Sequence, residues 1–238
     1  MKKYLIQIGC ILVFISSCHP TVRESKTSVQ ATKMDSVKIE MAEDIKDLIT
    51  SGFYNKEETI DEIKDIFYNE PLDESWINEM AEKEYNKRLA EQSSWPAVTD
   101  FDKLARVFDQ LNTSGIIALH KAGNTRQDGE EDTREMHQEL AGKGIKTTGY
   151  CFYHTQDMDR AIDSHHLFLA FGDFINNDQQ GAEIGKKIVE LLHQSGFATK
   201  WDNSIETRIE ILNINWLKRF GNENCSYEHA KKLLAKNK

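Results

Sequence analysis

The sequence lacks the short motifs that identify the common catalytic, metal and cofactor sites. It has no paired Cys-x-x-Cys, no two-histidine helix pair and no glycine-rich phosphate loop. Zinc binding and nucleotide binding of the kinds that use these motifs are therefore not predicted. The Gly-x-Ser-x-Gly turn of the α/β-hydrolases is also missing, which removes the clearest signature of a serine nucleophile. We predict no metal and no cofactor, and no motif assigns a reaction.

Cysteine is scarce, with four residues in the whole chain. Cys10 and Cys18 lie at the N-terminus, which leaves Cys151 and Cys225 in the body of the protein. An oxidising compartment would permit a disulfide between these two. Cys151 lies inside a predicted strand, where a small buried apolar residue is the favoured interpretation. The sequence leaves this pairing open.

No hydrophobic run is long enough to cross a membrane. The apolar run from Tyr4 to Ile15 is shorter than the roughly 20 residues that a spanning helix needs. It follows Lys2 and Lys3 and is followed by small residues, an arrangement typical of a secretory signal peptide. We therefore predict a signal peptide over residues 1–17.

Cys18 follows Ser16 and Ser17 directly after this apolar run. The arrangement resembles the bacterial lipobox, in which the cysteine is lipidated and becomes the first residue of the mature protein. Ile15 stands where the lipobox usually has leucine, so an ordinary secretory signal peptide remains an alternative. Lipid chains gain about 0.8 kcal/mol per buried methylene. The resemblance implies an envelope lipoprotein, anchored to the membrane through Cys18 and facing the periplasm or the outer surface.

Positive charge is in deficit, with 30 basic residues against 39 acidic ones and a formal net charge of −9. Loss of Lys2 and Lys3 with a signal peptide would make the balance more negative. A protein that binds nucleic acid neutralises phosphates with basic side chains. We therefore predict no nucleic-acid partner, and the simplest interpretation of the acidic surface is solubility.

The remaining chain divides into three segments. Residues 18–34 show no hydrophobic periodicity, which predicts a flexible tether. Residues 35–114 carry apolar side chains at helical spacing, with Asn55, Asp73 and Thr99 as helix N-caps. Residues 115–238 alternate short apolar strands with helices. This order predicts an α+β (or α/β) fold, a helical region followed by a sheet of roughly five strands, in one globular unit.

The stretch YCFYHTQDMDR, Tyr150 to Arg160, carries a concentration of polar groups where a strand leads into a helix. We expect Thr155 to cap this helix and Asp157 to lie in its first turn, where carboxylates are stabilised by the helix dipole. Arg160 stands three residues after Asp157, a spacing that allows the two to pair. Helix-start chemistry therefore explains the charges of this stretch.

His154 and Gln156 are not explained in this way. They follow the predicted strand, at the end where polar groups converge in α/β folds. The unperturbed pKa of histidine, about 6.5, suits a general base at neutral pH. We therefore keep His154 and Gln156 as candidate site residues.

A second polar cluster covers residues 123–132, GNTRQDGEED. A calcium-loop interpretation fails because Arg126 stands where an oxygen ligand is needed. We expect Asp128-Gly129 to form a turn and the following acids to begin the next helix. Thr125 and Asp128 remain candidate binding residues.

Six blocks occur in an order that resembles one known family: AEQSSWPAVTDFDKL, GIIALHKAGNTRQDGEED, GYCFYHTQDMDRA, LFLAFGDF, IGKKIV and WDNSIETRIEI. They resemble an uncharacterised bacterial family, the domain of unknown function 6891, from about Ile45 to Arg219. The resemblance implies an architecture but no activity, and most relatives lack this chain's signal and tether. The site positions that it implies are His120, Gly123, Thr125, Asp128, Gly129, His154, Gln156, Asp157, Arg160, Trp201 and Asp202.

Two functions follow as hypotheses. The favoured one is a non-enzymatic binding module on the envelope for a peptide, a protein or a small ligand. In one version of this hypothesis, the module protects the cell against a toxin. Its ligand site would include His120, Asp128 and His154, with Thr125, Gln156, Arg160 and Trp201 as further contacts. The alternative is a hydrolase or transferase in which His154 acts as general base, oriented by Asp157 or Asp128.

Overall fold

The computed structural model describes residues 26–221 and 223–237. The predicted signal peptide and Cys18 lie outside these residues. The helices are α1 (Lys26–Ser51), α2 (Lys56–Ile66), α3 (Glu74–Gln92), α4 (Asp100–Thr113), α5 (Arg126–Gly142), α6 (Thr155–Ser164), α7 (Asp178–Gln194) and α8 (Tyr227–Leu234). The strands are β1 (Ile116–Leu119), β2 (Gly149–Phe152), β3 (His166–Asp173), β4 (Ala198–Lys200) and β5 (Ile209–Leu212). No helix in the described part is both long and apolar enough to span a bilayer.

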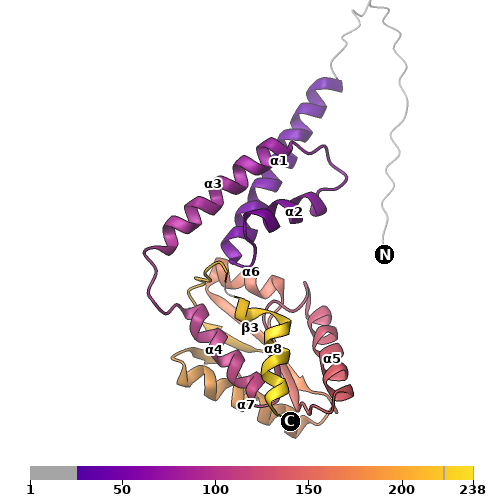
Figure 1. Ribbon diagram of the computed structural model, residues 1–238, viewed down its shortest axis with the longest axis vertical. Helices are drawn as coiled ribbons and strands as arrows, with labels where there is room; N and C mark the ends of the chain where they lie inside the picture. The colour runs from indigo at the N-terminus through magenta and orange to yellow at the C-terminus, as the bar shows by residue number, and fades with distance from the viewer. Residues whose placement is uncertain (1–25, 222, 238) are drawn as a thin grey trace, which may run out of the picture.

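Helices α1, α2 and α3 form a unit that projects from the rest of the chain (Figure 1). They bury a hydrophobic cluster of their own, centred on Ile45, Ile63 and Ile77, each 0 % exposed. The predicted caps begin two of these helices: Asn55 forms a capping box with Glu58, and Asp73 begins α3. The side-chain oxygens of the two caps accept the backbone N–H groups that the first helical turn leaves without partners.

The first helix begins earlier than predicted. α1 starts at Lys26 and so includes much of the segment 18–34 that we expected to be a flexible tether. Residues 26–34 contain no proline and no glycine. Nothing in their sequence therefore stops the helix of residues 35–51 from propagating backwards, since adding a residue to an existing helix is easier than starting one.

The fourth helix packs with the sheet rather than with α1 to α3. Thr99 caps α4 in a capping box with Asp102, as the sequence predicted for the cap. Phe101, Phe108 and Leu111 of α4 are buried in the same cluster as residues of β1, β2 and β3. The predicted helical region 35–114 therefore divides between two hydrophobic clusters.

Across the described residues the strands form one five-stranded mixed sheet in the order β1-β2-β3-β5-β4. β1 and β2 are parallel, with α5 as the crossover between them, and every other neighbouring pair is antiparallel. This arrangement confirms the predicted α+β fold with a sheet of about five strands.

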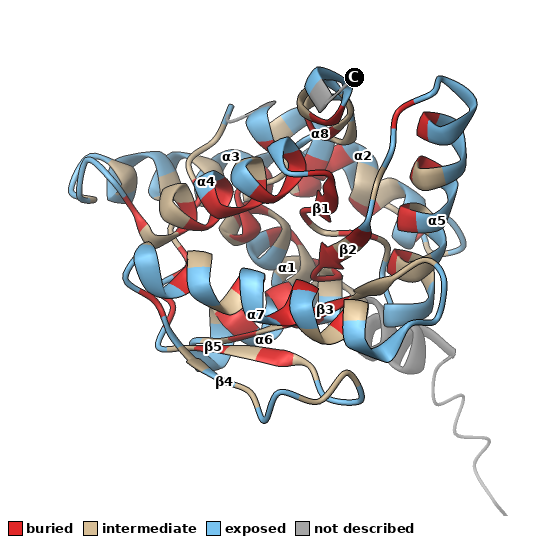
Figure 2. Ribbon diagram, turned by 90° about the horizontal axis from the view of Figure 1, so that it is seen from below, coloured by how far each residue is buried: buried red, intermediate tan, exposed pale blue. Residues whose placement is uncertain are grey.

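Each face of the sheet is covered by helices. Side chains alternate along a strand, so Ile116 and Ala118 enter the cluster with α4 and α7, whereas Ile117 and Leu119 enter the one with α5 and α8. Figure 2 shows the buried residues concentrated on β1 and β2 and on the sides of α4 and α7 that face the sheet. Both faces of β1 are therefore buried, whereas β3 in the centre of the sheet keeps half-buried positions at His166 and Phe168.

Candidate functional site

His154 is the N-cap of α6, and both nitrogens of its ring are engaged. Nδ1 accepts the backbone N–H of Asp157 at 3.3 Å, and Nε2 lies 2.9 Å from Oδ2 of the same residue. Because Nδ1 accepts, the proton of the neutral ring is on Nε2, which donates to the carboxylate. The His154 side chain is 7 % exposed, and this burial lowers the pKa of His154, against the opposing effect of Asp157.

We predicted Thr155 as the N-cap of α6, but the cap is His154, one residue earlier. Thr155 is the first residue of α6, and its hydroxyl donates to the carbonyl of Gly123 at 3.0 Å and to Oδ1 of Asn124 at 3.1 Å. The hydroxyl is therefore used to join two segments, and the histidine before it takes the capping position. These contacts also show that the two polar clusters meet, although through Thr155 and Asn124 rather than through His154 and Asp128.

Asp157 is held by an arginine from a distant segment. Its side chain is 1 % exposed, and its oxygens accept bonds of 2.8 and 3.0 Å from Nη1 of Arg208. The expected partner, Arg160, instead lies over the ring of Phe168, with its guanidinium carbon 5.1 Å from the ring centroid. The guanidinium carbon of Arg208 lies 4.8 Å from the same centroid. A buried carboxylate needs both charge and hydrogen bonds, and Arg208 supplies both at closer range. His154, Asp157 and Arg208 thus fasten α6 to the start of β5.

Asp128 is also a capping residue. Its carboxylate accepts the backbone N–H groups of Thr125 at 2.9 Å and Asn124 at 3.1 Å, and Thr125 caps α5 in return. These hydrogen bonds lower the pKa of Asp128, the one from Thr125 most strongly. The predicted turn at Asp128-Gly129 is therefore wrong, because both residues lie in the first turns of α5. Gly129 is required there, since a Cβ would lie 2.3 Å from the ring of Phe152.

Trp201 and Asp202 build a turn. The indole N–H of Trp201 donates to the carbonyl of Ser204 at 2.9 Å, and Asp202 accepts the backbone N–H of Ser204. The indole packs edge-on against Phe171, with ring centroids 5.4 Å apart. Gln156, the other candidate outside the capping pairs, is exposed. The structure therefore gives Trp201 a packing role.

His120 is buried between aromatic rings. Its ring stacks on Phe108 at a centroid distance of 4.3 Å, and Nδ1 lies 3.0 Å from the hydroxyl of Tyr153. Burial lowers the pKa of His120 to about 3, so the ring is neutral at physiological pH. Nε2 has no hydrogen-bond partner among the described residues.

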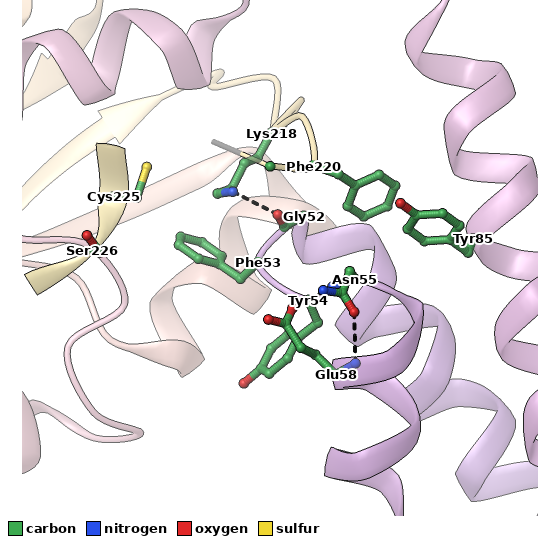
Figure 3. A pocket seen from close by; sticks show the side chains of 11 residues that line it. Gly52, Phe53, Tyr54, Asn55, Glu58, Tyr85, Lys218, Phe220, Cys225 and Ser226 are labelled. Carbon is green, nitrogen blue, oxygen red and sulfur yellow. Dashed lines mark hydrogen bonds between the residues drawn. The ribbon is translucent and has the colours of Figure 1, made fainter. Parts of the chain in front are cut away.

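A pocket of about 690 Å³ lies between the turn after α1 and the segment that leads into α8. Figure 3 shows Phe53 on one side of it and the paired rings of Tyr85 and Phe220 on the other. These two rings stack with centroids 4.5 Å apart. A volume of this size with aromatic walls is typical of small-molecule sites.

Lys218 is the cation of this pocket. Its side chain is buried, at 3 % exposure, and Nζ donates to the carbonyl of Gly52 at 2.7 Å. The ammonium lies 4.6 Å from the ring centroid of Phe53 and 5.5 Å from that of Phe101. Burial lowers the pKa of Lys218, with smaller opposing effects from Cys225 and Glu58. Among the described side chains Nζ forms no ion pair with a carboxylate, and its hydrogen bonds go to the carbonyls of Gly52 and Arg219.

The two remaining cysteines are free thiols, so the disulfide that the sequence left open is not formed. Cys225 borders the pocket beside Ser226. Burial raises the pKa of Cys225 to about 12 and that of Cys151 even further. Both are therefore neutral at physiological pH, and neither is an activated nucleophile.

Sequence reasoning missed the residues of this pocket. Phe53 follows α1, Tyr85 lies on α3, and Lys218 and Phe220 follow β5. No local pattern joins these three segments. The available signal was weak: Lys218 stands between the apolar residues Trp216, Leu217 and Phe220, and lysine is almost never fully buried unless it is paired.

Comparison with known proteins bears on the family alone. No curated protein and no solved structure gives a significant match to the chain. A family model described as a domain of unknown function (DUF6891) matches residues 34–220. The match spans the pocket residues Phe53, Tyr85, Lys218 and Phe220 as well as the His154–Asp157 pair. The chain therefore belongs to the DUF6891 family, as its sequence blocks indicated.

Proposed function

We propose that this chain is a binding module that holds a small organic acid, or the carboxylate end of a peptide, in the pocket beside Lys218. One observation carries the proposal: Lys218, whose ammonium is buried without a carboxylate partner among the described side chains, is one of the residues that line a pocket with aromatic walls. An unpaired buried charge is costly. A bound carboxylate would remove this cost.

The remaining hydrogen-bonding capacity of Lys218 supports this ligand class. An ammonium has three N–H donors, and those of Lys218 meet the carbonyls of Gly52 at 2.7 Å and Arg219 at 3.4 Å. One donor is left for a ligand. A hydrogen bond to a charged group contributes roughly 1.5–3 kcal/mol, and Phe53 and Tyr85 would bury the apolar part of the molecule.

The other charged group of the pocket is already engaged. Glu58 accepts the backbone N–H of Asn55 at 2.8 Å in the capping box of α2. A second cationic anchor is absent from the described residues around the pocket. The arrangement therefore favours a ligand with one acidic group and an apolar body over one with several charges.

Isothermal titration with hydrocinnamate, and with its uncharged amide as the matched ligand, tests this function. We expect the acid to bind the wild-type protein more tightly than the amide, and the Lys218→Met variant to lose this preference. Lys186→Met is the control, because Lys186 is an exposed residue of α7 paired with Glu183. Equal binding of acid and amide by the wild type would contradict the proposal.

We also propose that the protein is an envelope lipoprotein, anchored through lipid on Cys18. The support is the basic start, short apolar run and small residues that precede Cys18. Membrane fractionation of cells that express the full chain tests it. The wild type should sediment with membranes and Cys18→Ser should become soluble; a membrane-bound Cys18→Ser variant would rule out the anchor.

We do not propose the alternative, a hydrolase or transferase with His154 as general base. That role needs a ring nitrogen open to a substrate. Nδ1 and Nε2 of His154 are both occupied by Asp157. A histidine in this state holds a helix in place and has no position from which to accept a proton.

A further inference from the structure

The setting of Lys218 differs from that of the chain's surface lysines. Lys56 and Lys231 form hydrogen bonds of 2.7 Å with Glu82 and Glu139, which raise their pKa values. Lys218 has the opposite environment, with two aromatic rings, the carbonyl of Gly52 and little solvent around its amine. Burial of this kind raises the fraction of neutral amine, which is the nucleophilic form of lysine, while the remaining ammonium is the form that would bind a carboxylate.

We propose that Lys218 is a reactive amine that condenses with an aldehyde or ketone bound in the pocket and forms an imine. The inference rests on the ligand site of the proposed function and adds a covalent step to it. Position supports the step, because Nζ belongs to a residue that borders a pocket large enough for the carbonyl compound. The flexible four-carbon stem of lysine allows the amine to turn from Gly52 toward a ligand.

The chemistry needs no cofactor or oxidant. The lone pair of Nζ attacks the carbonyl carbon, and the carbonyl oxygen takes up a proton, which gives a carbinolamine. Loss of the hydroxyl group with the remaining N–H proton forms the C=N bond and releases one water molecule. Two N–H bonds and one C=O bond are thus replaced by one C=N bond and one water, with no change of oxidation state.

The walls of the pocket indicate the class of carbonyl compound. Phe53 lies next to the amine, and the stacked pair of Tyr85 and Phe220 lies across from it (Figure 3). Flat aromatic surfaces favour a flat apolar ligand, because ring–ring contacts contribute roughly 0.5–1.5 kcal/mol beyond the burial of area. An aromatic aldehyde fits these walls, and conjugation with its ring stabilises the imine.

Reductive trapping tests the inference. The full chain is incubated with a limiting amount of anisaldehyde and sodium cyanoborohydride at neutral pH, and the modified lysines are mapped by peptide mass spectrometry. We expect Lys218 to be modified several-fold faster than Lys186, although Lys186 is far more exposed. If the rate of modification simply increases with the solvent exposure of each lysine, so that Lys218 reacts no faster than Lys186, the inference is overturned.

Two further measurements separate the covalent step from simple binding. Lys218→Arg cannot form an imine, so it should lose the trapped adduct at this position, while the labelling of Lys186 should not change. Excess hydrocinnamate should slow the labelling of Lys218 in the wild type, a test that requires no variant to fold. If hydrocinnamate binds and Lys218 is not trapped, the imine fails alone. If Lys218 is trapped and hydrocinnamate does not bind, the preference for an acid fails and the imine stands.

Discussion

The ammonium of Lys218 donates a hydrogen bond of 2.7 Å to the carbonyl of Gly52, which precedes it by 166 residues. The two residues also touch through their backbones, because Gly52 adopts a φ of +75° directly against the carbonyl of Lys218. The bond joins the turn after α1 to the segment after β5. It therefore connects the projecting helices to the sheet at the point where the pocket forms.

Gly52→Ala should destabilise the protein and weaken ligand binding at this pocket. An added Cβ would lie 2.5 Å from the carbonyl oxygen of Lys218, and a left-handed conformation costs roughly 1–2 kcal/mol in a residue with a side chain. We expect a loss of more than about 2 kcal/mol in urea unfolding. Gly196→Ala is the control, because Gly196 has a φ of +88° with nothing within 4 Å. Equal losses for the two variants would show that the contact with Lys218 contributes nothing.

Arg208→Met should strongly destabilise the fold. The change leaves the carboxylate of Asp157 buried without its ion-pair partner. Breaking a buried pair in this way costs about 3–5 kcal/mol, and we expect the low end, because Arg208 is partly exposed. Arg160→Met is the matched control, since Arg160 packs on the same Phe168 ring without bonding to Asp157. Similar midpoints of denaturation for the two variants would refute a stabilising role for the pair.

His154→Ala should lower stability by about 1 kcal/mol or more, because the first turn of α6 loses its cap. His154→Asn should restore part of this loss, since an asparagine oxygen can accept the N–H of Asp157. Neither change should alter the affinity for hydrocinnamate, because His154 does not line the pocket beside Lys218. A selective loss of binding in His154→Ala, at unchanged stability, would return this residue to the functional site.

Asp159→Asn should stabilise the protein at high pH and not at low pH. Asp159 borders a second pocket of about 310 Å³ beside α1, where burial, Asp47 and Asp163 raise its pKa to about 6, against the opposing effect of Lys121. A raised pKa means that the folded state holds the proton more tightly than the unfolded state. The stability that protonated Asp159 contributes to the folded state is therefore fully present below the ordinary pKa of 3.8. This stability is lost as the pH rises through about 6.

Thermal unfolding of wild type and Asp159→Asn across this pH range measures the effect. We expect the variant's advantage to be modest, because the side chain stands at the surface and solvent screens its charge. The advantage should grow between about pH 4 and pH 7 and then level off. A difference that does not change with pH would argue against a raised pKa of Asp159 in the folded state.

Much of the helical structure could be predicted from the sequence. Asn55, Asp73 and Thr99 cap their helices through residues no more than three positions away. Such contacts form within one turn of chain, so local sequence is sufficient. The cap of α6 was missed by one residue, because the hydroxyl of Thr155 is bound by Gly123, 32 positions away. Similarly, the sequence Asp128-Gly129 predicted a turn, because glycine is common in turns. The glycine is instead required by the ring of Phe152, which belongs to another element and is not visible in the local sequence.

The α+β class, the starts of α2, α3 and α4 and the family follow from the amino-acid order alone, because they depend on short-range periodicity, capping and the order of blocks along the chain. The candidate site depends instead on how distant segments pack. The tertiary structure paired Asp157 with Arg208 rather than Arg160, engaged both nitrogens of His154, and brought Lys218 against Gly52 and Phe53. Burial of a charge and the choice of its partner depend on which distant segments pack together, and no local pattern in the sequence carries that information.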